Sequence, residues 1–211
     1  TRSVQTVMLL FAFELWARQV LDAPAVGSEA KVPELEATPV DLSVIIVNWN
    51  TRDILRNCLA SVETHLAAVS REIIVVDNAS SDGSAEMVAK EFPWARLMRN
   101  VENVGFGRAN NQGMRVARGQ WCLLLNSDTV LIDDSVGRLF TRVRNEPELG
   151  IAHCRLLKPD GRLQYSTYRF PSIRLSLLED FGLYKLLSPA RRGEVLLSGY
   201  WEQDKERDVD W

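Results

Sequence analysis

The sequence predicts an α/β fold in which a mainly parallel, Rossmann-like sheet is flanked by helices. From residue 42 onward, short apolar segments alternate with segments of helical periodicity, and the connections between them are short. Near-continuous apolar segments are typical of strands in a buried parallel sheet. Several of these strands end on Asn or Asp. Because ligands bind at the carboxyl ends of parallel strands, the polar ends predict one shared site.

The composition is that of an ordinary globular protein with one main core. Of its 211 residues, 46% are hydrophobic and 25% are charged. The net charge is −3 and both signs are interspersed, so we expect no nucleic-acid partner. The three cysteines, Cys58, Cys122 and Cys154, lack CxxC spacing, which favours reduced core residues in a cytosolic protein over a disulfide framework or a zinc site.

Residues 1–41 are predicted to form an amphipathic helix and a linker ahead of the main domain, residues 42–211. Apolar residues at helical spacing predict a helix over residues 4–21. The apolar run at residues 7–13 is too short to span a bilayer, and an acidic residue argues against a signal peptide. The helix either belongs to preceding sequence or docks on the domain or on a membrane surface. The prolines of residues 22–41 indicate a linker.

The first strand of the domain begins at Leu42 and ends at Asn48, Trp49 and Asn50. Thr51 can cap the helix that follows.

The second strand covers residues 72–76 and ends at Asp77. Asp82 is the expected N-cap of the next helix. Pro93 ends that helix, and residues 95–99 form a third strand.

A glycine-bearing loop at Gly105 and Gly107 then leads into a helix and a buried strand at residues 120–125. This strand ends on Asn126 and Asp128. Both side chains are oxygen donors, which Mg²⁺ and Mn²⁺ prefer.

The rest of the chain is predicted from weaker patterns. We expect a turn at residues 158–162 between two strands that form a hairpin, and little structure in the last residues. The expected elements are a helix at 133–144, strands at 150–157 and 163–168, and a helix at 172–187.

Five motifs occur in order: VIIVNWN, VVDNASSDGS, NVGFGRANNQG, LLLNSDT and LLKPDGRLQ. Together they resemble family 2 glycosyltransferases of the GT-A fold, and most of all the bacterial rhamnosyltransferase-like members that build cell-surface polysaccharides. The resemblance covers residues 42–170. It implies an inverting enzyme that transfers a sugar from a UDP- or dTDP-sugar, with dTDP-rhamnose as one example, to a saccharide or lipid-linked acceptor. It also implies a cytoplasmic enzyme, with peripheral contact to the inner face of the cell membrane as an alternative.

The resemblance assigns roles to the strand ends. Asp77 should meet the nucleobase, because a carboxylate accepts a hydrogen bond from N3–H of uracil or thymine but finds no such hydrogen on cytosine. Asn78 is placed with it at the donor. Asn48, Trp49 and Asn50 should line the nucleotide pocket, although a packed core aromatic is an equal alternative for Trp49.

Asp128 corresponds to the last acid of the family's DxD motif, which holds Mg²⁺ or Mn²⁺ on the donor diphosphate. The first position is Asn126, whose amide adds no charge, so weaker metal affinity is expected. Gly105 and Gly107 should let the backbone approach the donor. Asn110 is a further donor candidate, with a cap or surface role as the alternative.

Two other classes of protein stay open. A dinucleotide-binding oxidoreductase-like module would use Gly105, Gly107 and Asp128 as a GxGxxG loop and a ribose-binding acid. A non-catalytic nucleotide-binding domain is the other.

The general base of the family lies in an acidic motif that we expect beyond Trp211, so the chain is expected to be truncated on its acceptor side. We expect Glu179 and Asp180 to be helix-surface residues.

Overall fold

The computed structural model describes residues 8–12, 40–146, 149–164, 166, 177, 180–188 and 191. The chain divides into two compact units, residues 1–154 and 155–211. The described elements of the first unit, in order along the chain, are β1 Met8–Ala12, β2 Leu42–Asn48, α2 Arg52–His65, β3 Arg71–Asp77, α3 Ser84–Glu91, β4 Arg96–Arg99, α4 Phe106–Arg115, β5 Trp121–Asn126, α5 Ser135–Val143 and β6 Ile151–Ala152.

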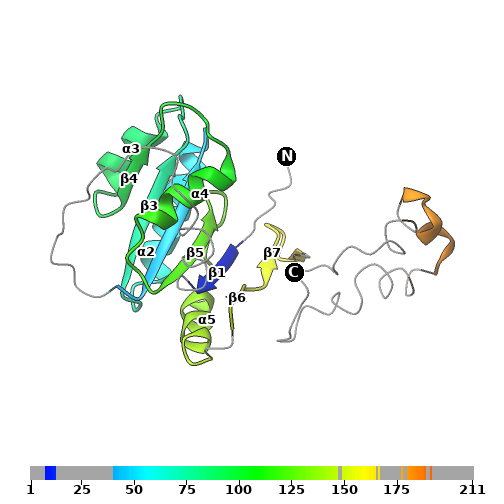
Figure 1. Cartoon of the computed structure of the whole chain (residues 1–211). Coiled ribbons are helices and arrows are strands. Elements are labelled where there is room, and N and C mark those ends of the chain that lie inside the picture. The colour runs from blue at the N-terminus through cyan, green and yellow to red at the C-terminus, as the bar shows by residue number, and fades with distance from the viewer. Residues whose placement is uncertain are drawn as a thin grey trace, which may run out of the picture. The chain divides into compact units, whose positions relative to one another are not determined.

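Six described strands of this unit form one sheet in the order β4-β3-β2-β5-β1-β6. The pairs β4-β3, β3-β2 and β2-β5 are parallel, and β1 is antiparallel to both β5 and β6 (Figure 1). The predicted mainly parallel sheet flanked by helices is therefore confirmed. The helices between parallel strands are the crossover connections that such a sheet requires.

The helix predicted over residues 4–21 is wrong at the residues that the structure describes. Met8–Ala12 is the strand β1, not part of a helix, and the rest of residues 4–21 lies outside the described residues. Strand β1 pairs with β5 from Met8↔Leu125 to Ala12↔Trp121. This pairing covers the edge of β5 that faces away from β2. A short apolar run fits a buried strand as well as a helix, and here the pairing with β5 decides between them.

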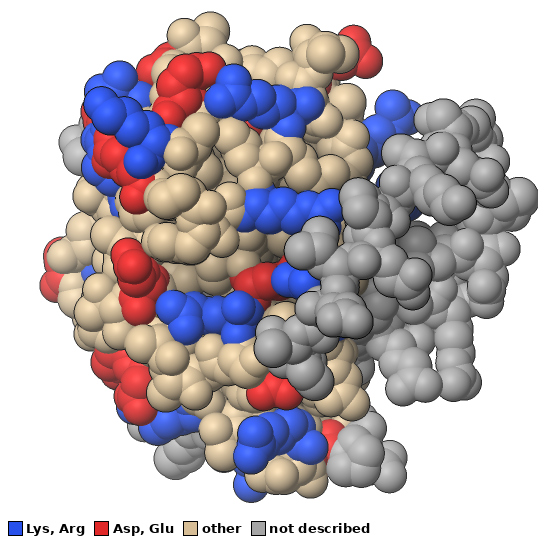
Figure 2. All heavy atoms as spheres, turned by 90° about the vertical axis from the view of Figure 1, so that its left-hand side faces the viewer, with Lys and Arg blue, Asp and Glu red and all other residues tan. Residues whose placement is uncertain are grey.

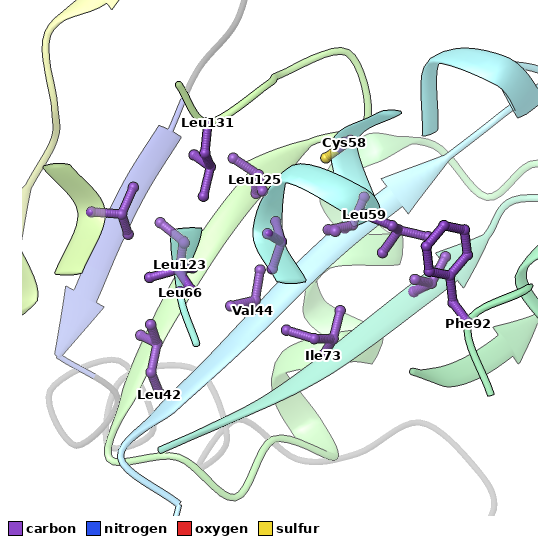
Figure 3. Close-up of a cluster of buried hydrophobic side chains, with 14 of the residues drawn as sticks. Leu42, Val44, Cys58, Leu59, Leu66, Ile73, Phe92, Leu123, Leu125 and Leu131 are labelled. Atoms are coloured by element: carbon purple, nitrogen blue, oxygen red, sulfur yellow. The ribbon is translucent and has the colours of Figure 1, made fainter. Parts of the chain in front are cut away.

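The larger part of the core lies between the sheet and the helices α2, α3 and α5. Figure 3 shows apolar side chains of the strands facing those of α2 and of the segment after α3. Leu42 and Val44 of β2, Leu123 of β5, and Cys58 and Leu59 of α2 are among its fully buried members. This packing fixes β2 and β5 side by side in the middle of the sheet, where their carboxyl ends are held rigidly.

The opposite face of the sheet is covered by α4 (Figure 1). A smaller cluster joins α4 to β2 and β3 through Ala109, Met114, Ile45 and Val76. Gly113 allows the close approach, because a Cβ at this position would lie 2.6 Å from Ile45 Cγ2. Helix α4 therefore starts near the carboxyl ends of the strands and runs back along them.

A polar network closes the opposite, amino-terminal edge of the sheet. Glu72 Oε1 accepts hydrogen bonds from Ser43 Oγ (2.6 Å) and Arg118 N (2.6 Å). Ser43 Oγ in turn accepts from Gly119 N (2.8 Å). Hydrogen bonds to a charged group are among the stronger ones in proteins. The network ties the start of β5 to β2 and β3, and so supports the alignment of their far ends.

Gly119→Ala should destabilise the protein, by about 2–4 kcal/mol, because the added Cβ would lie 2.5 Å from Ser43 N and 2.8 Å from Leu42 C. Gly137→Ala is the matched control. It lies inside α5, where the new methyl group meets only Val69 Cγ2 at 3.8 Å, and it should stabilise by about 0.5–1 kcal/mol. Urea unfolding measures both values. Equal effects of the two changes would contradict the packing described at Gly119.

The helix caps differ from the prediction in one detail. The N-cap of α3 is Gly83, with φ +81°, and not Asp82. Asp82 still serves both helix starts, since Oδ1 accepts from Ser84 N (3.0 Å) and Oδ2 from Arg52 N (2.8 Å). Partial burial opposes its ionisation, but the hydrogen bonds from Ser84 and Arg52 outweigh burial and lower the pKa of Asp82. Thr51 is the N-cap residue of α2, yet its hydroxyl makes no cap hydrogen bond.

The second unit contains β7 Leu156–Leu157 and β8 Leu163–Gln164, an antiparallel pair. The predicted turn between them is confirmed by hydrogen bonds from Lys158 N to Arg162 O and from Gly161 N to Lys158 O, both 2.8 Å. The predicted strand at 150–157 is divided between β6 and β7. Of the helix predicted at 172–187, most of the first half lies outside the described residues, and Leu183–Leu186 forms a 3-10 helix, η1.

Charged side chains of both signs alternate on the face shown in Figure 2. Ion pairs also join separate elements of the first unit. Arg56 of α2 contacts Glu91 of α3 (2.7 Å), and Arg99 of β4 contacts Glu86 of α3 (2.8 Å). Among the described residues, no helix combines the length and the apolar character that crossing a membrane would need.

Candidate functional site

The carboxyl ends of β2, β3 and β5 meet at one edge of the sheet. The strand register pairs Asn48 with Asp77 and Val47 with Asn126, so the polar residues that end these strands stand at one level. Adjacent strands are about 4.8 Å apart, which puts the ends of β3 and β5 about 10 Å apart across β2. The sequence-based prediction that the polar strand ends converge is therefore confirmed.

Asp77 ends β3 and is 3% exposed. Its Oδ1 accepts a hydrogen bond from Asn48 Nδ2 (3.0 Å), and its Oδ2 accepts one from Ser80 N (3.0 Å). Each oxygen of an ionised carboxylate can accept more than one hydrogen bond. These two bonds fix the orientation of the carboxylate and leave it capacity for an N–H donor of a ligand.

Asn48 lies beneath the site and does not line it. The side chain is fully buried. Its Nδ2 donates to Asp77 and to Ser80 Oγ (3.0 Å), and its Oδ1 accepts from Thr51 Oγ1 (2.5 Å). With both amide hydrogens donated and its oxygen accepting, Asn48 is not the direct ligand contact that the sequence analysis expected, and it acts by holding Asp77.

Asn78 is also a supporting residue. It is 2% exposed, and its Oδ1 accepts from Asn100 Nδ2 (3.0 Å) and Val104 N (3.0 Å). Its Nδ2 donates to Asn103 Oδ1 (2.7 Å), which also accepts from Gly105 N (2.9 Å). This amide network fixes the loop between β4 and α4. The sequence analysis missed Asn100 and Asn103, although Asn100 follows a predicted strand as the other site residues do.

The loop after β4 leads into the first turn of α4. Gly105 has φ +86°, which favours glycine. Apart from chain neighbours and the helix's own backbone, no atom of the described residues lies within 4 Å of a Cβ built at Gly105 or Gly107. The first turn of α4 is therefore open, and Phe106 is 56% exposed. Asn110 is 5% exposed, and its Nδ2 donates to Phe106 O (3.1 Å). Asn110 is therefore neither a helix cap, since Gly105 and Val116 cap α4, nor a surface residue, and its amide is used within the helix.

Trp49 and Asn50 form the exposed connection after β2. Trp49 is 56% exposed, so the alternative of a packed core aromatic is wrong. Asn50 has φ +54°, and its Oδ1 accepts from Ser81 N (2.7 Å). Ala79, in the connection after β3, also has a left-handed φ of +63°. Such backbone costs alanine about 1–2 kcal/mol and is retained here at the polar edge of the sheet.

The loop after β5 carries Asp128, which is half-buried. Asn126 O accepts from Thr129 N (3.0 Å) and from Cys58 Sγ (3.7 Å), which ties the end of β5 to the middle of α2. Burial, with the nearby Asp128 carboxylate, raises the pKa of the Cys58 thiol to about 12. Ser127 Oγ lies 3.1 Å from Thr51 Oγ1. The acidic loop is therefore anchored to the α2 side of the sheet edge.

The oxygen donors at Asp128 fit a hard cation whose coordination is completed by the phosphates of a bound nucleotide. Among the described residues, no group of three or more His, Cys, Asp or Glu side chains could hold a metal ion alone. Mg²⁺ is commonly bound by one or two carboxylates together with phosphate oxygens and water. Asp128 supplies one carboxylate, and the Asn126 amide is a neutral neighbour, so a diphosphate would have to contribute the remaining charge.

The sequence also drew attention to three cysteines and to two acids of the C-terminal half. Cys58 and Cys122 are buried and Cys154 is half-buried, and all three are free thiols. Asp180 is exposed in the second unit, and Glu179 lies outside the described residues. Nothing in the described contacts assigns a general base.

The GxGxxG-like loop is not where a dinucleotide-binding fold would place it. It follows β4, which is the edge strand of the sheet, whereas the phosphate loop of a Rossmann fold follows a central strand. The geometry therefore defines an α/β class of protein with a polar candidate site at the carboxyl ends of its parallel strands. This site combines Asp77, at the end of β3, with the acidic loop after β5.

The comparisons with known proteins give the family. The model described as glycosyl transferase family 2 matches residues 43–195, and the chain belongs to this family. This agrees with the resemblance and with the GT-A type of fold.

The chain spans about a third of the length of the curated relatives that it matches. It is 29% identical over 134 residues to the succinoglycan biosynthesis protein ExoO of Rhizobium meliloti, covering 62% of this chain and 37% of that protein. It is 32% identical over 116 residues to the uncharacterized glycosyltransferase YibD of Escherichia coli, covering 54% and 33%. A poly-beta-1,6-N-acetyl-D-glucosamine synthase of Staphylococcus aureus matches at 28% identity over 127 residues, covering 58% and 29%.

Solved structures match more distantly. The S. aureus TarS fragment in complex with UDP is 20% identical, with a TM-score of 0.44, over 51% of this chain and 33% of that one. The mannosyltransferase PcManGT of Pyrobaculum calidifontis, in complex with GDP-Man and Mn²⁺, is 23% identical with a TM-score of 0.43, over 63% and 39%.

Proposed function

We propose that the chain binds the nucleotide diphosphate donor of an inverting glycosyl transfer reaction, a UDP- or dTDP-sugar such as dTDP-rhamnose. The acceptor is a saccharide or a lipid-linked saccharide, and the product is a cell-surface polysaccharide. We propose a cytoplasmic location for the reaction, with the inner face of the cell membrane as the alternative. Family membership and the names of relatives that make succinoglycan or poly-N-acetylglucosamine support this assignment.

One observation carries the proposal, the placement of Asp77 and Asp128 on either side of β2 at one edge of the sheet. The separation suits a nucleoside diphosphate, with its base at Asp77 and its diphosphate at the loop after β5. Asp77 would accept the N3–H of uracil or thymine, because its two protein hydrogen bonds leave lone pairs open.

The exposed start of α4 would face the donor as well. Its first backbone N–H groups lack partners within the helix and favour negative charge, and no Cβ crowds them at Gly105 or Gly107. Trp49 and Asn50 would form the rim of the nucleotide pocket from the other side of the edge.

Asp128 would hold Mg²⁺ or Mn²⁺ against the diphosphate. When bound, the cation would offset the charge that develops on the departing nucleoside diphosphate. Asn126 adds no charge to the site, so we expect the protein alone to bind the cation weakly and the nucleotide to complete the site.

Calorimetry with UDP, dTDP, CDP, GDP and NAD, each with and without Mn²⁺, tests the proposal. UDP and dTDP should bind more tightly than CDP, GDP and NAD, and Mn²⁺ should strengthen their binding. Tighter binding of NAD that is indifferent to Mn²⁺ would favour the dinucleotide-binding alternative. Nucleotide binding without release of nucleoside diphosphate from any sugar donor would favour the non-catalytic one.

A further inference from the structure

A chain of hydrogen bonds runs beneath the site from the loop after β5 to the end of β3. Ser127 Oγ contacts Thr51 Oγ1 (3.1 Å), Thr51 Oγ1 contacts Asn48 Oδ1 (2.5 Å), and Asn48 Nδ2 contacts Asp77 Oδ1 (3.0 Å). The residues come from three separate segments, and Ser127 follows Thr51 by 76 positions in the sequence. The chain therefore connects the two acids of the proposed site, Asp77 directly and Asp128 through its neighbour.

The direction of every bond in this chain follows from the chemistry of its members. An ionised carboxylate only accepts, so the Asn48 group that faces Asp77 is its NH₂ group, and its carbonyl oxygen faces Thr51. That oxygen also only accepts, so the single hydroxyl hydrogen of Thr51 is used there. At the remaining contact Ser127 must donate to Thr51.

We propose that Thr51 is a positioning residue that supports both the nucleobase contact at Asp77 and cation binding at Asp128. This inference rests on the proposed function and deepens it. Thr51 lies between the two ends of the hydrogen-bond chain. Its hydroxyl donates to Asn48 and accepts a hydrogen bond from the Ser127 hydroxyl. Its hydroxyl makes no cap hydrogen bond to α2, so local helix formation does not explain these contacts.

The bond directions predict an asymmetry. Without the Thr51 hydroxyl, the fully buried Asn48 oxygen loses its donor and the acidic loop loses its contact with Thr51. Both the base preference and the cation effect should then fall. Without the Ser127 hydroxyl, Thr51 still donates to Asn48. The cation effect should then fall while the base preference stays.

The experiment measures two ratios by calorimetry for each variant: the affinity for UDP over that for CDP, and the affinity for UDP with Mn²⁺ over that without it. Thr51→Val should lower each ratio by about tenfold, the effect of one lost net hydrogen bond. Thr51→Ser keeps the hydroxyl and should restore both. Ser127→Ala should lower only the second ratio.

Thr64→Val is the matched control, because it makes the same change on the same helix. Thr64 Oγ1 donates to Ala60 O (2.8 Å) at an exposed position, and both ratios should stay at the wild-type value. Thermal unfolding of each variant shows whether it is folded, and Ser127→Ala carries the test if Thr51→Val is unfolded.

The proposal is overturned if Thr51→Val leaves both ratios unchanged, or if it weakens UDP and CDP equally. It is also overturned if Ser127→Ala leaves the cation effect intact. A wild-type protein that shows neither base preference nor a cation effect contradicts the proposed function itself, which is a separate outcome.

Discussion

Asp128→Ala is expected to abolish the strengthening of UDP binding by Mn²⁺. Asp128 is the first carboxylate after β5 and is half-buried, and a divalent cation at a diphosphate is usually held by one or two protein carboxylates. Loss of this electrostatic group should also lower any glycosyl transfer rate by about 10²–10³-fold. Binding of UDP without a cation should change little, because the base contact at Asp77 remains.

Glu63→Ala is the control for the loss of a carboxylate, since Glu63 is exposed on α2. It should leave the Mn²⁺ effect at the wild-type value. A Mn²⁺ effect that survives in Asp128→Ala would place the cation elsewhere and remove the metal role of this loop.

Asp77→Asn should weaken UDP and dTDP and bring them to the level of CDP. The change keeps the shape of the side chain, but one of its two acceptor groups becomes a donor, and the charge is lost. A hydrogen bond to a charged group contributes about 1.5–3 kcal/mol, which is about 10–150-fold in affinity. The Mn²⁺ effect should persist, because Asp128 is unchanged.

Asp53→Asn is the matched control for the loss of a charge without a change of shape. Asp53 is exposed and pairs with Arg56 (2.7 Å) on α2. If Asp77→Asn keeps the preference for UDP over CDP, the base is read by another residue, and the exposed Trp49 and Asn50 become the next candidates.

The sequence was sufficient to predict the sheet and the edge that carries the site. Near-continuous apolar segments that alternate with helical ones fit the buried strands of a parallel sheet. Asp77 ends one of these strands, and Asp128 follows another by two residues. Helical spacing misled at Met8–Ala12 because the strand is selected by pairing with β5, a partner more than a hundred positions away. Such a pairing leaves no signal in local periodicity.

Residue type also could not separate side chains that face a ligand from those that support them. Asn48, Asn78 and Asn110 lie within the motifs, as the exposed Asn50 does. Burial and hydrogen bonding nevertheless place these three side chains beneath the surface. The contact between Thr51 and Ser127 depends on how two loops meet, and only the structure contains that information.

The most direct test of the account is a crystal structure of the chain with UDP and Mn²⁺, using the anomalous signal of manganese. We expect uracil N3–H within hydrogen-bond distance of the Asp77 carboxylate, and the manganese peak between the Asp128 carboxylate and the diphosphate. Nucleotide bound away from the carboxyl ends of β2, β3 and β5, or manganese away from Asp128 with the diphosphate in place, would contradict it.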